Sequence, residues 1–191
     1  MKVVFFHASP KKEGKIGQII QEMQSEAEKS KIETQLLFLS DLTIQECTSC
    51  GKCIENKKCV FRDDIKQIEE AILHSDVLVF ATPTHWGNIS SVLLKVFERL
   101  VGFVIRQNGN KPPIAFHAKG KKAVLITACS TPRPLNWIFN QSRSAISRMN
   151  EFCRYSGIKV IKKIVLPGTR RLSDIPNKIK EQSRKILRSV I

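Results

Sequence analysis

Residues 75–100 read S-D-V-L-V-F-A-T-P-T-H-W-G-N-I-S-S-V-L-L-K-V-F-E-R-L, and this stretch determines the class of fold. Asp76–Ala81 is a continuous apolar run, as expected for a strand of a parallel sheet that is buried on both faces. The turn-forming run T-P-T-H-W-G-N interrupts it, and a helix is predicted over Ile89–Leu100. A buried strand, a loop and a helix in this order form the repeating unit of an α/β protein.

The same unit recurs on both sides of this stretch. Further strands are predicted at Lys2–Phe6, Ile32–Leu39, Ala123–Thr127 and Ile158–Leu166. Further helices are predicted at Ile16–Ser30, from an N-cap at Asp63 or Asp64 onward, at Asn136–Tyr155 and at Ser173–Ile191. Residues 103–119 contain two prolines and the turn signal N-G-N without a clear period, and they are interpreted as a long loop. Five alternations predict one domain, residues 1–191, with a doubly wound five-stranded parallel sheet and helices on both faces.

Ligands of such sheets bind beyond the carboxyl ends of the strands. Three loops should meet there: Ala8–Lys15, Thr82–Asn88 and Ala128–Pro132. The first precedes a helix N-terminus, where free N–H groups and the helix dipole favour an anion. It lacks both the G-x-G-x-x-G and the Walker patterns, so the phosphate of a mononucleotide is favoured over a dinucleotide or ATP. An ordinary turn with solvated lysines is the alternative interpretation.

The second and third loops carry groups that suit a flat ring. Trp86 and His85 are followed by Gly87 and Asn88. The aromatic side chain could lie along a flat ring, and the neighbouring small and amide-bearing residues could bind the edge of that ring. Each signal is weak in isolation, because a single Trp or His is more often structural. Their convergence with the third loop at one edge of the sheet favours a binding site there.

Four of the six cysteines lie in the segment C-T-S-C-G-K-C-I-E-N-K-K-C, at Cys47, Cys50, Cys53 and Cys59. The C-x2-C-x2-C spacing is that of thiolates that hold a [4Fe–4S] cluster. Zinc sites more often consist of two separated C-x2-C pairs or of cysteine and histidine pairs, and this segment has no histidine. The sequence therefore favours an iron–sulfur cluster in a loop of about residues 40–62 after the second strand. Zinc, redox-active thiols and an empty remnant of an ancestral site are the alternatives.

The charge of the chain is uneven. Residues 1–100 contain 13 Lys+Arg and 14 Asp+Glu, whereas residues 101–191 contain 19 and 3. A basic half favours an anionic or acidic partner, or serves only to keep the protein soluble. Nucleic acid is not favoured, because no known nucleic-acid motif is present and few stacking aromatic residues are nearby. The residues of the final helix that could contact its phosphates are Lys178, Lys180, Arg184, Lys185 and Arg188.

The chain begins with M-K-V-V-F-F, without the charged, apolar and cleavage regions of a secretory signal. No apolar run approaches the roughly 20 residues that span a bilayer. A cytoplasmic protein without a membrane segment is therefore expected.

The chain resembles the iron–sulfur flavoproteins, a branch of the NADPH-dependent FMN reductase family of flavodoxin-like proteins. The resemblance rests on S-P-K-K-x-G after the first strand, on the cysteine segment with the following C-V-F-R-D-D, on residues 75–100 and on F-C-R-Y-S-G-I-K-V-I. It runs over most of the chain. Many relatives keep only the last three of the four cysteines and hold no cluster, so Cys47 is the residue that points to the iron–sulfur branch.

The resemblance implies bound FMN, a [4Fe–4S] cluster near the flavin and a homo-oligomer, either a dimer or a tetramer. The cluster ligands would be the four clustered cysteines. The phosphate of FMN would lie at Ser9–Ile16, and the isoalloxazine ring against Pro83–Ile89 and Ala128–Thr131. The residues so implied in FMN binding are Ser9, Pro10, Lys11, Gly14, Lys15, Ile16, Pro83, Thr84, His85, Trp86, Gly87, Asn88, Ile89, Ala128, Cys129, Ser130 and Thr131.

Three positions depart from the family pattern. Lys15 and Ile16 stand where relatives usually have Asn and Ser or Thr, His85 replaces a common aromatic residue, and Ala8 replaces a glycine. The loss of one hydroxyl bond to a charged phosphate costs about 1.5–3 kcal/mol, and the charge of Lys15 offsets a similar amount. FMN binding is therefore expected to be weakened and not abolished.

The implied function is that of an oxidoreductase whose cluster and flavin connect a one-electron carrier with a two-electron acceptor. The basic residues around the cysteines should attract an acidic, ferredoxin-like carrier; they are Lys52, Lys57, Lys58 and Arg62. The alternative is an NAD(P)H-dependent FMN or quinone reductase with an empty cysteine loop.

Overall fold

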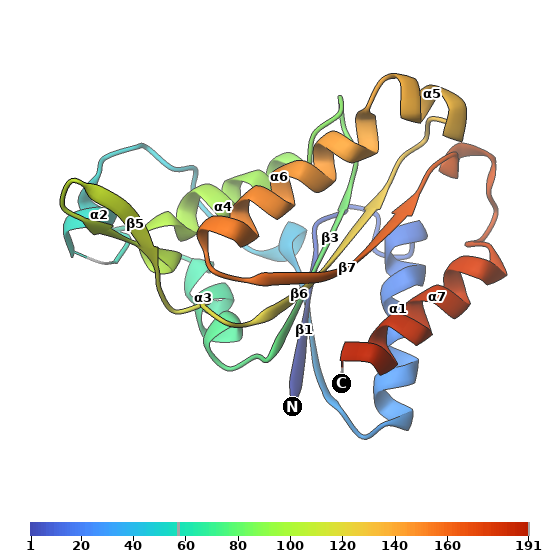
Figure 1. Cartoon of the computed structure of the whole chain (residues 1–191), viewed down its shortest axis with the longest axis horizontal. Helices are drawn as coiled ribbons and strands as arrows, with labels where there is room; N and C mark the ends of the chain where they lie inside the picture. The colour runs from blue at the N-terminus through green and yellow to red at the C-terminus, as the bar shows by residue number, and fades with distance from the viewer. Residues whose placement is uncertain (57, 191) are drawn as a thin grey trace.

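The computed structural model describes residues 1–56 and 58–190. Five parallel strands form one sheet in the order β2–β1–β3–β6–β7 (Figure 1). The strands are β1 (Lys2–His7), β2 (Glu33–Phe38), β3 (Val77–Pro83), β6 (Lys122–Ala128) and β7 (Lys159–Leu166). This is the flavodoxin-like order, and it confirms the doubly wound parallel sheet expected from the sequence.

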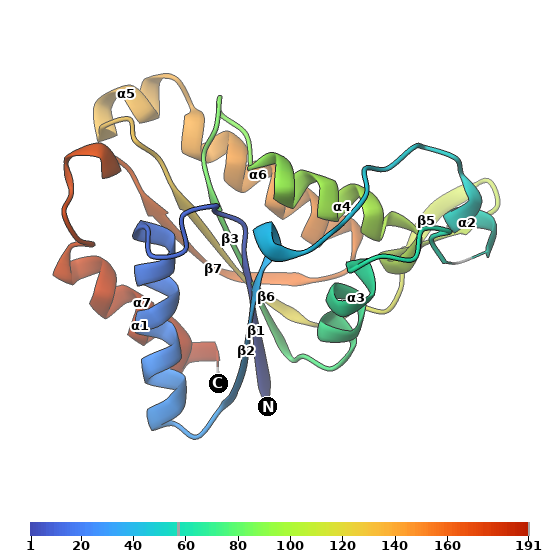
Figure 2. The same ribbon diagram turned by 180° about the vertical axis from the view of Figure 1, so that it is seen from behind.

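Helices cover both faces of the sheet (Figures 1 and 2). On one face α1 (Lys15–Lys29) and α7 (Asn177–Val190) lie side by side. The other face carries α3 (Ile65–Leu73), α4 (Ser91–Val104) and α6 (Gln141–Tyr155). Within the described residues no helix combines the length and the apolar character needed to cross a membrane.

An apolar core fills the space on each side of the sheet. Val4 and Phe6 of β1 belong to the core under α3, α4 and α6, whereas Val3 and Phe5 belong to the core under α1 and α7. At the centre, Phe80 of β3 stacks on Phe6 with ring centroids 5.2 Å apart. Because both faces are covered, the central strands are apolar over most of their length, from Val3 to Phe6 and from Val77 to Ala81, as their sequences indicated.

Ion pairs between α1 and α7 use part of the positive charge of the final helix. Arg184 and Arg188 pair with Glu22 and Glu26 of α1 at 2.6 and 2.7 Å. Lys185 pairs with Glu181 within α7 at 2.7 Å. Three of the five basic residues that could have faced nucleic-acid phosphates are therefore paired with carboxylates.

Residues 103–119 do not form the long loop that was expected. Helix α4 continues to Val104, and an antiparallel hairpin of β4 (Ile105–Asn108) and β5 (Lys111–Ala115) follows. Its turn contains the N-G-N signal. The prolines of β5 concealed the strand in the sequence, because proline is tolerated only where a strand has no partner on one edge.

The helix expected over Asn136–Tyr155 is two helices, α5 (Arg133–Ile138) and α6. Asn140 between them has a φ of 55°, in the left-handed region. The side chain of Asn136 accepts a hydrogen bond from the Ser142 N–H at 3.0 Å. This local bond ends one helix and starts the next. The final helix begins at Asn177, directly after Pro176, and not at Ser173; Ile191 lies outside the described residues.

A buried hydroxyl joins the loops at the carboxyl ends of β1 and β3. Ser90, which is 4% exposed, caps α4, where its Oγ accepts a hydrogen bond from the Leu93 N–H at 3.4 Å. The same hydroxyl donates to the carbonyl oxygen of Ala8 at 2.8 Å. The Ser90 N–H donates to Oγ1 of Thr82 at 2.9 Å. One side chain thereby fixes the first loop, the second loop and the start of α4.

Replacing Ser90 with alanine removes the helix cap and the donor to Ala8. We expect the free energy of unfolding, measured by urea denaturation, to fall by about 1–3 kcal/mol. Ser91→Ala is the matched control, because Ser91 is exposed and adjacent, and its effect should stay below about 0.5 kcal/mol. Equal effects of the two substitutions would contradict this role of Ser90.

Candidate functional site

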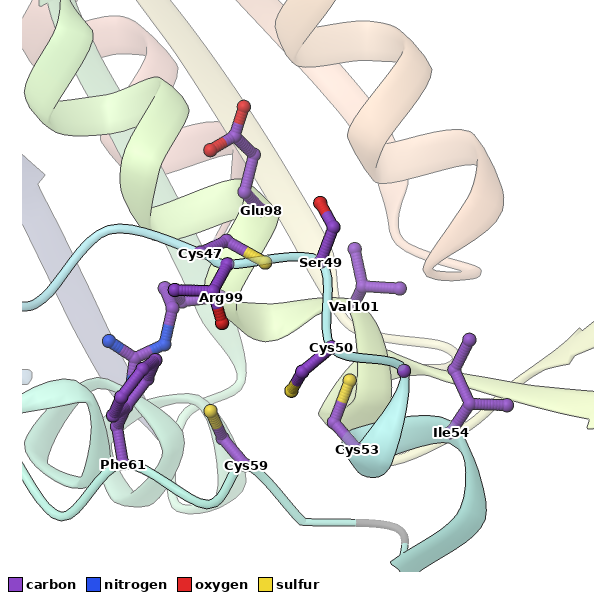
Figure 3. A pocket seen from close by; sticks show the side chains of 12 residues that line it. Cys47, Ser49, Cys50, Cys53, Ile54, Cys59, Phe61, Glu98, Arg99 and Val101 are labelled. Carbon is purple, nitrogen blue, oxygen red and sulfur yellow. The ribbon is translucent and has the colours of Figure 1, made fainter.

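The four clustered cysteines surround one cavity (Figure 3). Cys47, Cys50, Cys53 and Cys59 all line a space of about 410 Å³. The short helix α2 (Lys52–Asn56) carries Cys53, and irregular chain on either side carries the other three. The structure thus places around one cavity the four cysteines that were expected to be ligands, and all four are free thiols.

The chemistry of this cavity fits a soft metal centre. Its donors are thiols, and its other walls include Phe61, Val101 and the buried side chain of Arg99. Burial, followed by the neighbouring Cys59, raises the pKa of the Cys53 thiol. No three of the described His, Cys, Asp or Glu side chains are already grouped so as to hold a metal ion. The four thiols line the cavity without being grouped closely enough to hold a single metal ion, and thiolates are the ligands of iron–sulfur clusters.

The remaining two cysteines lie elsewhere. Cys153 is fully buried in the core, and burial raises the pKa of its thiol to about 12. Cys129 is 3% exposed and its Sγ donates to Oε1 of Gln141 at 3.2 Å, beside the third loop at the edge of the sheet.

Gly102 allows α2 to approach α4. A Cβ at residue 102 would lie 2.6 Å from Cβ and 2.7 Å from the carbonyl oxygen of Cys53. Both separations are shorter than packed atoms allow. A side chain at this position of α4 would therefore push Cys53 away from α4.

A buried ion pair closes the base of the cysteine loop. Arg99 of α4 donates from Nη1 and Nη2 to the two carboxylate oxygens of Asp63, at 2.7 and 3.0 Å. Nη1 of Arg99 also donates to the carbonyl oxygen of Gln45 at 2.6 Å, and Asp63 accepts from the Gln45 N–H at 2.9 Å. The residues just before and just after the cysteine segment are therefore held at one point.

The charge state of Asp63 follows from these bonds. Burial raises its pKa, but hydrogen bonds from Arg99 and from the N–H groups of Gln45 and Ile65 outweigh burial, so the pKa is lowered from its ordinary value. The carboxylate is therefore ionised at neutral pH. The pair would be lost only in acid, as the pH falls below the ordinary carboxylate pKa of about 4 towards the lower value in the folded protein.

The roles of Arg99 and Asp63 were missed in the sequence. Asp63 and Asp64 were interpreted as a helix start, and α3 does begin at Ile65. However, the Asp64 side chain makes no helix cap; it accepts from the Thr43 N–H at 2.7 Å, while Asp63 binds Arg99. The available signal was the position of Arg99 between the apolar residues Val96 and Leu100 on the buried side of α4. A cation there requires a buried partner.

The first loop wraps over the N-terminus of α1. Ser9 is 8% exposed, and its Oγ accepts from the Lys11 N–H at 3.2 Å. A Cβ at Gly17 would lie 1.8 Å from the carbonyl oxygen of Lys12, so only glycine permits this close passage. Gly14 stands at the N-cap and offers no side-chain acceptor. The first N–H groups of α1 are therefore available to an anion.

The residues that depart from the family pattern have structural roles in this loop. Ile16 is 3% exposed and packs into the core on the α1 side of the sheet. The Lys15 ammonium donates to the carbonyl oxygen of Ser173. Lys12 pairs with Asp41 at 2.5 Å, and Pro10 and Lys11 are exposed. Because Lys12 and Lys15 already have partners within the protein, only part of the positive charge of this loop faces the solvent, where a phosphate would bind.

A buried histidine supports the same loop. His7, at the end of β1, is fully buried, and its Nδ1 accepts from the Ser9 N–H at 3.4 Å. Burial lowers the pKa of His7, so the imidazole is neutral at pH 7. Within the described part of the chain its Nε2 has no hydrogen-bond partner.

The second loop is a tight turn beyond β3. His85 and Asn88 exchange main-chain hydrogen bonds of 3.0 and 2.8 Å, with Trp86 and Gly87 at positive φ between them. The Trp86 side chain is fully exposed at the tip of this turn. Pro83 and Ile89 frame the turn, the latter buried in the core.

The second and third loops are bonded to each other. Thr84 Oγ1 lies 2.9 Å from Oγ1 of Thr127, and the Thr84 N–H donates to the carbonyl oxygen of Ala128 at 2.9 Å. Thr131 donates to Oε1 of Gln141 at 2.7 Å, and Ser130 is exposed. Thr127 and Gln141 were not singled out in the sequence, because neither belongs to a recognisable motif.

Basic residues flank the cysteine cavity on the exposed surface. Lys52, Lys58 and Arg62 are exposed, and Lys57 lies outside the described residues. Exposed cations near a redox centre can attract an acidic protein, an effect that salt screens over about 8–10 Å.

Solved structures share this fold across the whole chain. An azoreductase from Bacillus anthracis superposes with a TM-score of 0.75 at 15% identity, covering 100% of this chain and 98% of that one. An NAD(P)H:quinone oxidoreductase from Methanothermobacter marburgensis gives a TM-score of 0.74 at 15% identity, with 99% and 94% covered. At such low identity the likeness shows the fold alone.

Curated relatives match part of the chain, between 53% and 63% of its residues in two cases. An iron–sulfur flavoprotein of Archaeoglobus fulgidus is 28% identical over 121 residues, 63% of this chain and 51% of the relative. One of Methanosarcina thermophila is 31% identical over 101 residues, 53% of each chain. The chain spans about half the length of these relatives. Residues 1–157, which contain all three loops and the four clustered cysteines, match the family described as NADPH-dependent FMN reductase. The chain belongs to the NADPH-dependent FMN reductase family.

Proposed function

We propose that this protein is an oxidoreductase that holds FMN at the three loops beyond the sheet and a [4Fe–4S] cluster in the cysteine cavity. The observation that carries the proposal is the convergence of four thiols on one cavity in a chain of this family. When bound, the cluster supplies one-electron transfer and FMN supplies one- or two-electron transfer.

The protein's own residues bind and orient these groups. The N–H groups at the start of α1 and the hydroxyl of Ser9 would hold the phosphate of FMN, and the hydrogen bonds of Thr84 would fix the two loops along its ring. Lys15 and Ile16 stand where relatives usually have polar residues, but Lys15 binds the Ser173 carbonyl oxygen and Ile16 packs into the core. Phosphate binding should therefore be weaker. The four cysteines would be the ligands of the cluster.

The partners proposed are an acidic, ferredoxin-like electron carrier or NAD(P)H, and a second copy of the chain. The carrier would approach the exposed Lys52, Lys58 and Arg62. The homo-oligomer would cover the groove between α4 and α6, where Leu94 and Tyr155 are exposed.

The second candidate is an NAD(P)H-dependent FMN or quinone reductase that holds no cluster. It is favoured by one observation: Cys47 and Cys50 are exposed and lie in irregular chain, outside any helix or strand. The two candidates differ in iron content and not in flavin content, so composition separates them.

The decisive experiment is to purify the protein without oxygen and to assay iron, acid-labile sulfide and FMN in one sample. We expect flavin absorption above a broad iron–sulfur shoulder, with about four irons and four sulfides per chain. Flavin without iron would support the second candidate. A preparation with neither group, even after reconstitution with iron, sulfide and FMN, would overturn both.

Replacing Cys47 with serine should separate the two sites. The variant should lose most of its iron and sulfide, because one of four thiolate ligands is missing, and should retain FMN. Thr48→Ser is the matched control, since Thr48 is exposed and adjacent, and its iron content should be unchanged. Full iron in the Cys47 variant would show that this residue is not a ligand.

Replacing Gly102 with alanine tests the approach of α2 to α4 in the metal-free protein. The added methyl group displaces Cys53, so we expect its thiol to react several-fold faster with an aromatic disulfide reagent. Ser91→Ala, at an exposed position of the same helix, should leave that rate unchanged. An unchanged rate in the Gly102 variant would mean that the close contact does not fix Cys53.

A further inference from the structure

We propose that Arg99 is a positioning residue of the cysteine cavity, which closes the base of the loop through Asp63 and offers its remaining N–H, at Nε, to sulfur inside the cavity. The sulfur would be that of Cys59 or a sulfide of a bound cluster. The role of Arg99 toward a cluster rests on the proposed function, which it deepens. The closure of the loop through Asp63 concerns the protein alone.

At the base of the loop, Arg99 and Asp63 are held in place by several hydrogen bonds. The side chains of Arg99 and Asp63 are 1% and 5% exposed. The Asp63 carboxylate accepts four hydrogen bonds: two from Arg99, one from the Gln45 N–H and one, of 3.2 Å, from the Ile65 N–H. Charge-assisted, bidentate bonds in a buried setting fix both geometry and charge.

Closure at this point restricts the whole cysteine segment. The Gln45–Asp63 bond spans 18 residues, and all four clustered cysteines lie between its ends. Folding brings these ends together, so the entropy cost of closing the loop arises on folding and not on metal binding. The loop is therefore partly organised before any ligand arrives.

One donor of Arg99 is not used by this closure. Its Nε is buried and has no hydrogen-bond acceptor in the part of the chain that the structure describes. Buried donors are rarely left without a partner, so this one points to an acceptor inside the cavity.

The position of the guanidinium identifies that acceptor. Arg99 lines the cavity with the four thiols. Its guanidinium carbon lies 5.0 Å from the ring centroid of Phe61, which also lines the cavity. In Figure 3, Arg99 and Phe61 lie on the same side of the cavity as Cys47 and Cys59, whereas Cys50 and Cys53 lie on the other side. A thiolate or sulfide there is an anionic acceptor for a cationic donor.

An N–H bond and a positive charge beside a metal-bound sulfur have known consequences. Both stabilise the more electron-rich state, so they raise the reduction potential of a cluster, and they orient the ligand and strengthen metal binding. Lysine cannot replace arginine, because a single ammonium cannot bind Asp63 through a fork and present a separate N–H to the cavity.

The test compares Arg99→Lys, Asp63→Asn and the control Arg62→Lys, which changes an exposed arginine in the same segment. Circular dichroism first establishes that each variant is folded. The metal-free proteins are then titrated with Cd²⁺ and followed by thiolate-to-metal absorption. Proteins reconstituted with iron and sulfide are compared by redox titration of the cluster.

We expect both Arg99→Lys and Asp63→Asn to weaken Cd²⁺ binding by about 10–100-fold, because each breaks the closure, and Arg62→Lys to leave it unchanged. Only Arg99→Lys should lower the potential of the cluster, because Asp63→Asn keeps the Nε donor. A purely structural arginine would lower Cd²⁺ affinity in both variants without lowering the potential.

The outcomes separate this inference from the proposed function. If the wild-type protein assembles a cluster but Arg99→Lys has unchanged Cd²⁺ affinity and potential, the function stands and the role of Arg99 is wrong. If the wild-type protein assembles no cluster but the Cd²⁺ affinities fall as expected, the function fails and the closure of a soft-metal loop by Arg99 stands. If Arg99→Lys fails to fold, the Asp63→Asn affinity decides the closure, and an unchanged value overturns it.

Discussion

The central constraint of this structure is that β3 is paired on both edges and covered on both faces. A parallel strand in this position can expose functional groups only where it ends, because its N–H and C=O groups are bonded to β1 and β6 and its side chains fill two cores. The loops beyond β1, β3 and β6 therefore meet at one edge. Ser90 and Thr84 then bond these loops to one another, so that the edge is a defined surface and not a set of independent turns.

Helix α4 extends this order to the cysteine cavity. Its N-terminus is capped by Ser90 at the edge of the sheet, and its later turns carry Arg99 and Gly102 at the cavity. At a rise of about 1.5 Å per residue, the cap and Arg99 are roughly 14 Å apart along the helix axis. A rigid helix packed on the core thus holds the loops at the edge of the sheet and the cysteine loop in a fixed relation. A bound FMN and a cluster would share that frame.

Patterns in the sequence predicted the sheet, most helices and the grouping of the cysteines, because these depend on local order. Apolar runs and their spacing can be read directly from the sequence, and four cysteines within 13 residues must lie near one another. The hairpin of β4 and β5 and the break at Asn140 were missed for a different reason. In each case a few residues, the prolines of β5 or the Asn136 side chain, override the pattern of their neighbours.

The fold class, the family and the identity of the four thiols can be read from residue types and short-range spacing. The way in which the thiols are held is a property of the tertiary structure. Asp63 and Arg99 are 36 residues apart, and Cys53 and Gly102 are further apart still, so no local pattern connects them. The tertiary structure also decided that Ile16 turns into the core and that Lys15 binds the Ser173 carbonyl oxygen, because a side chain's partner is set by what packs against it.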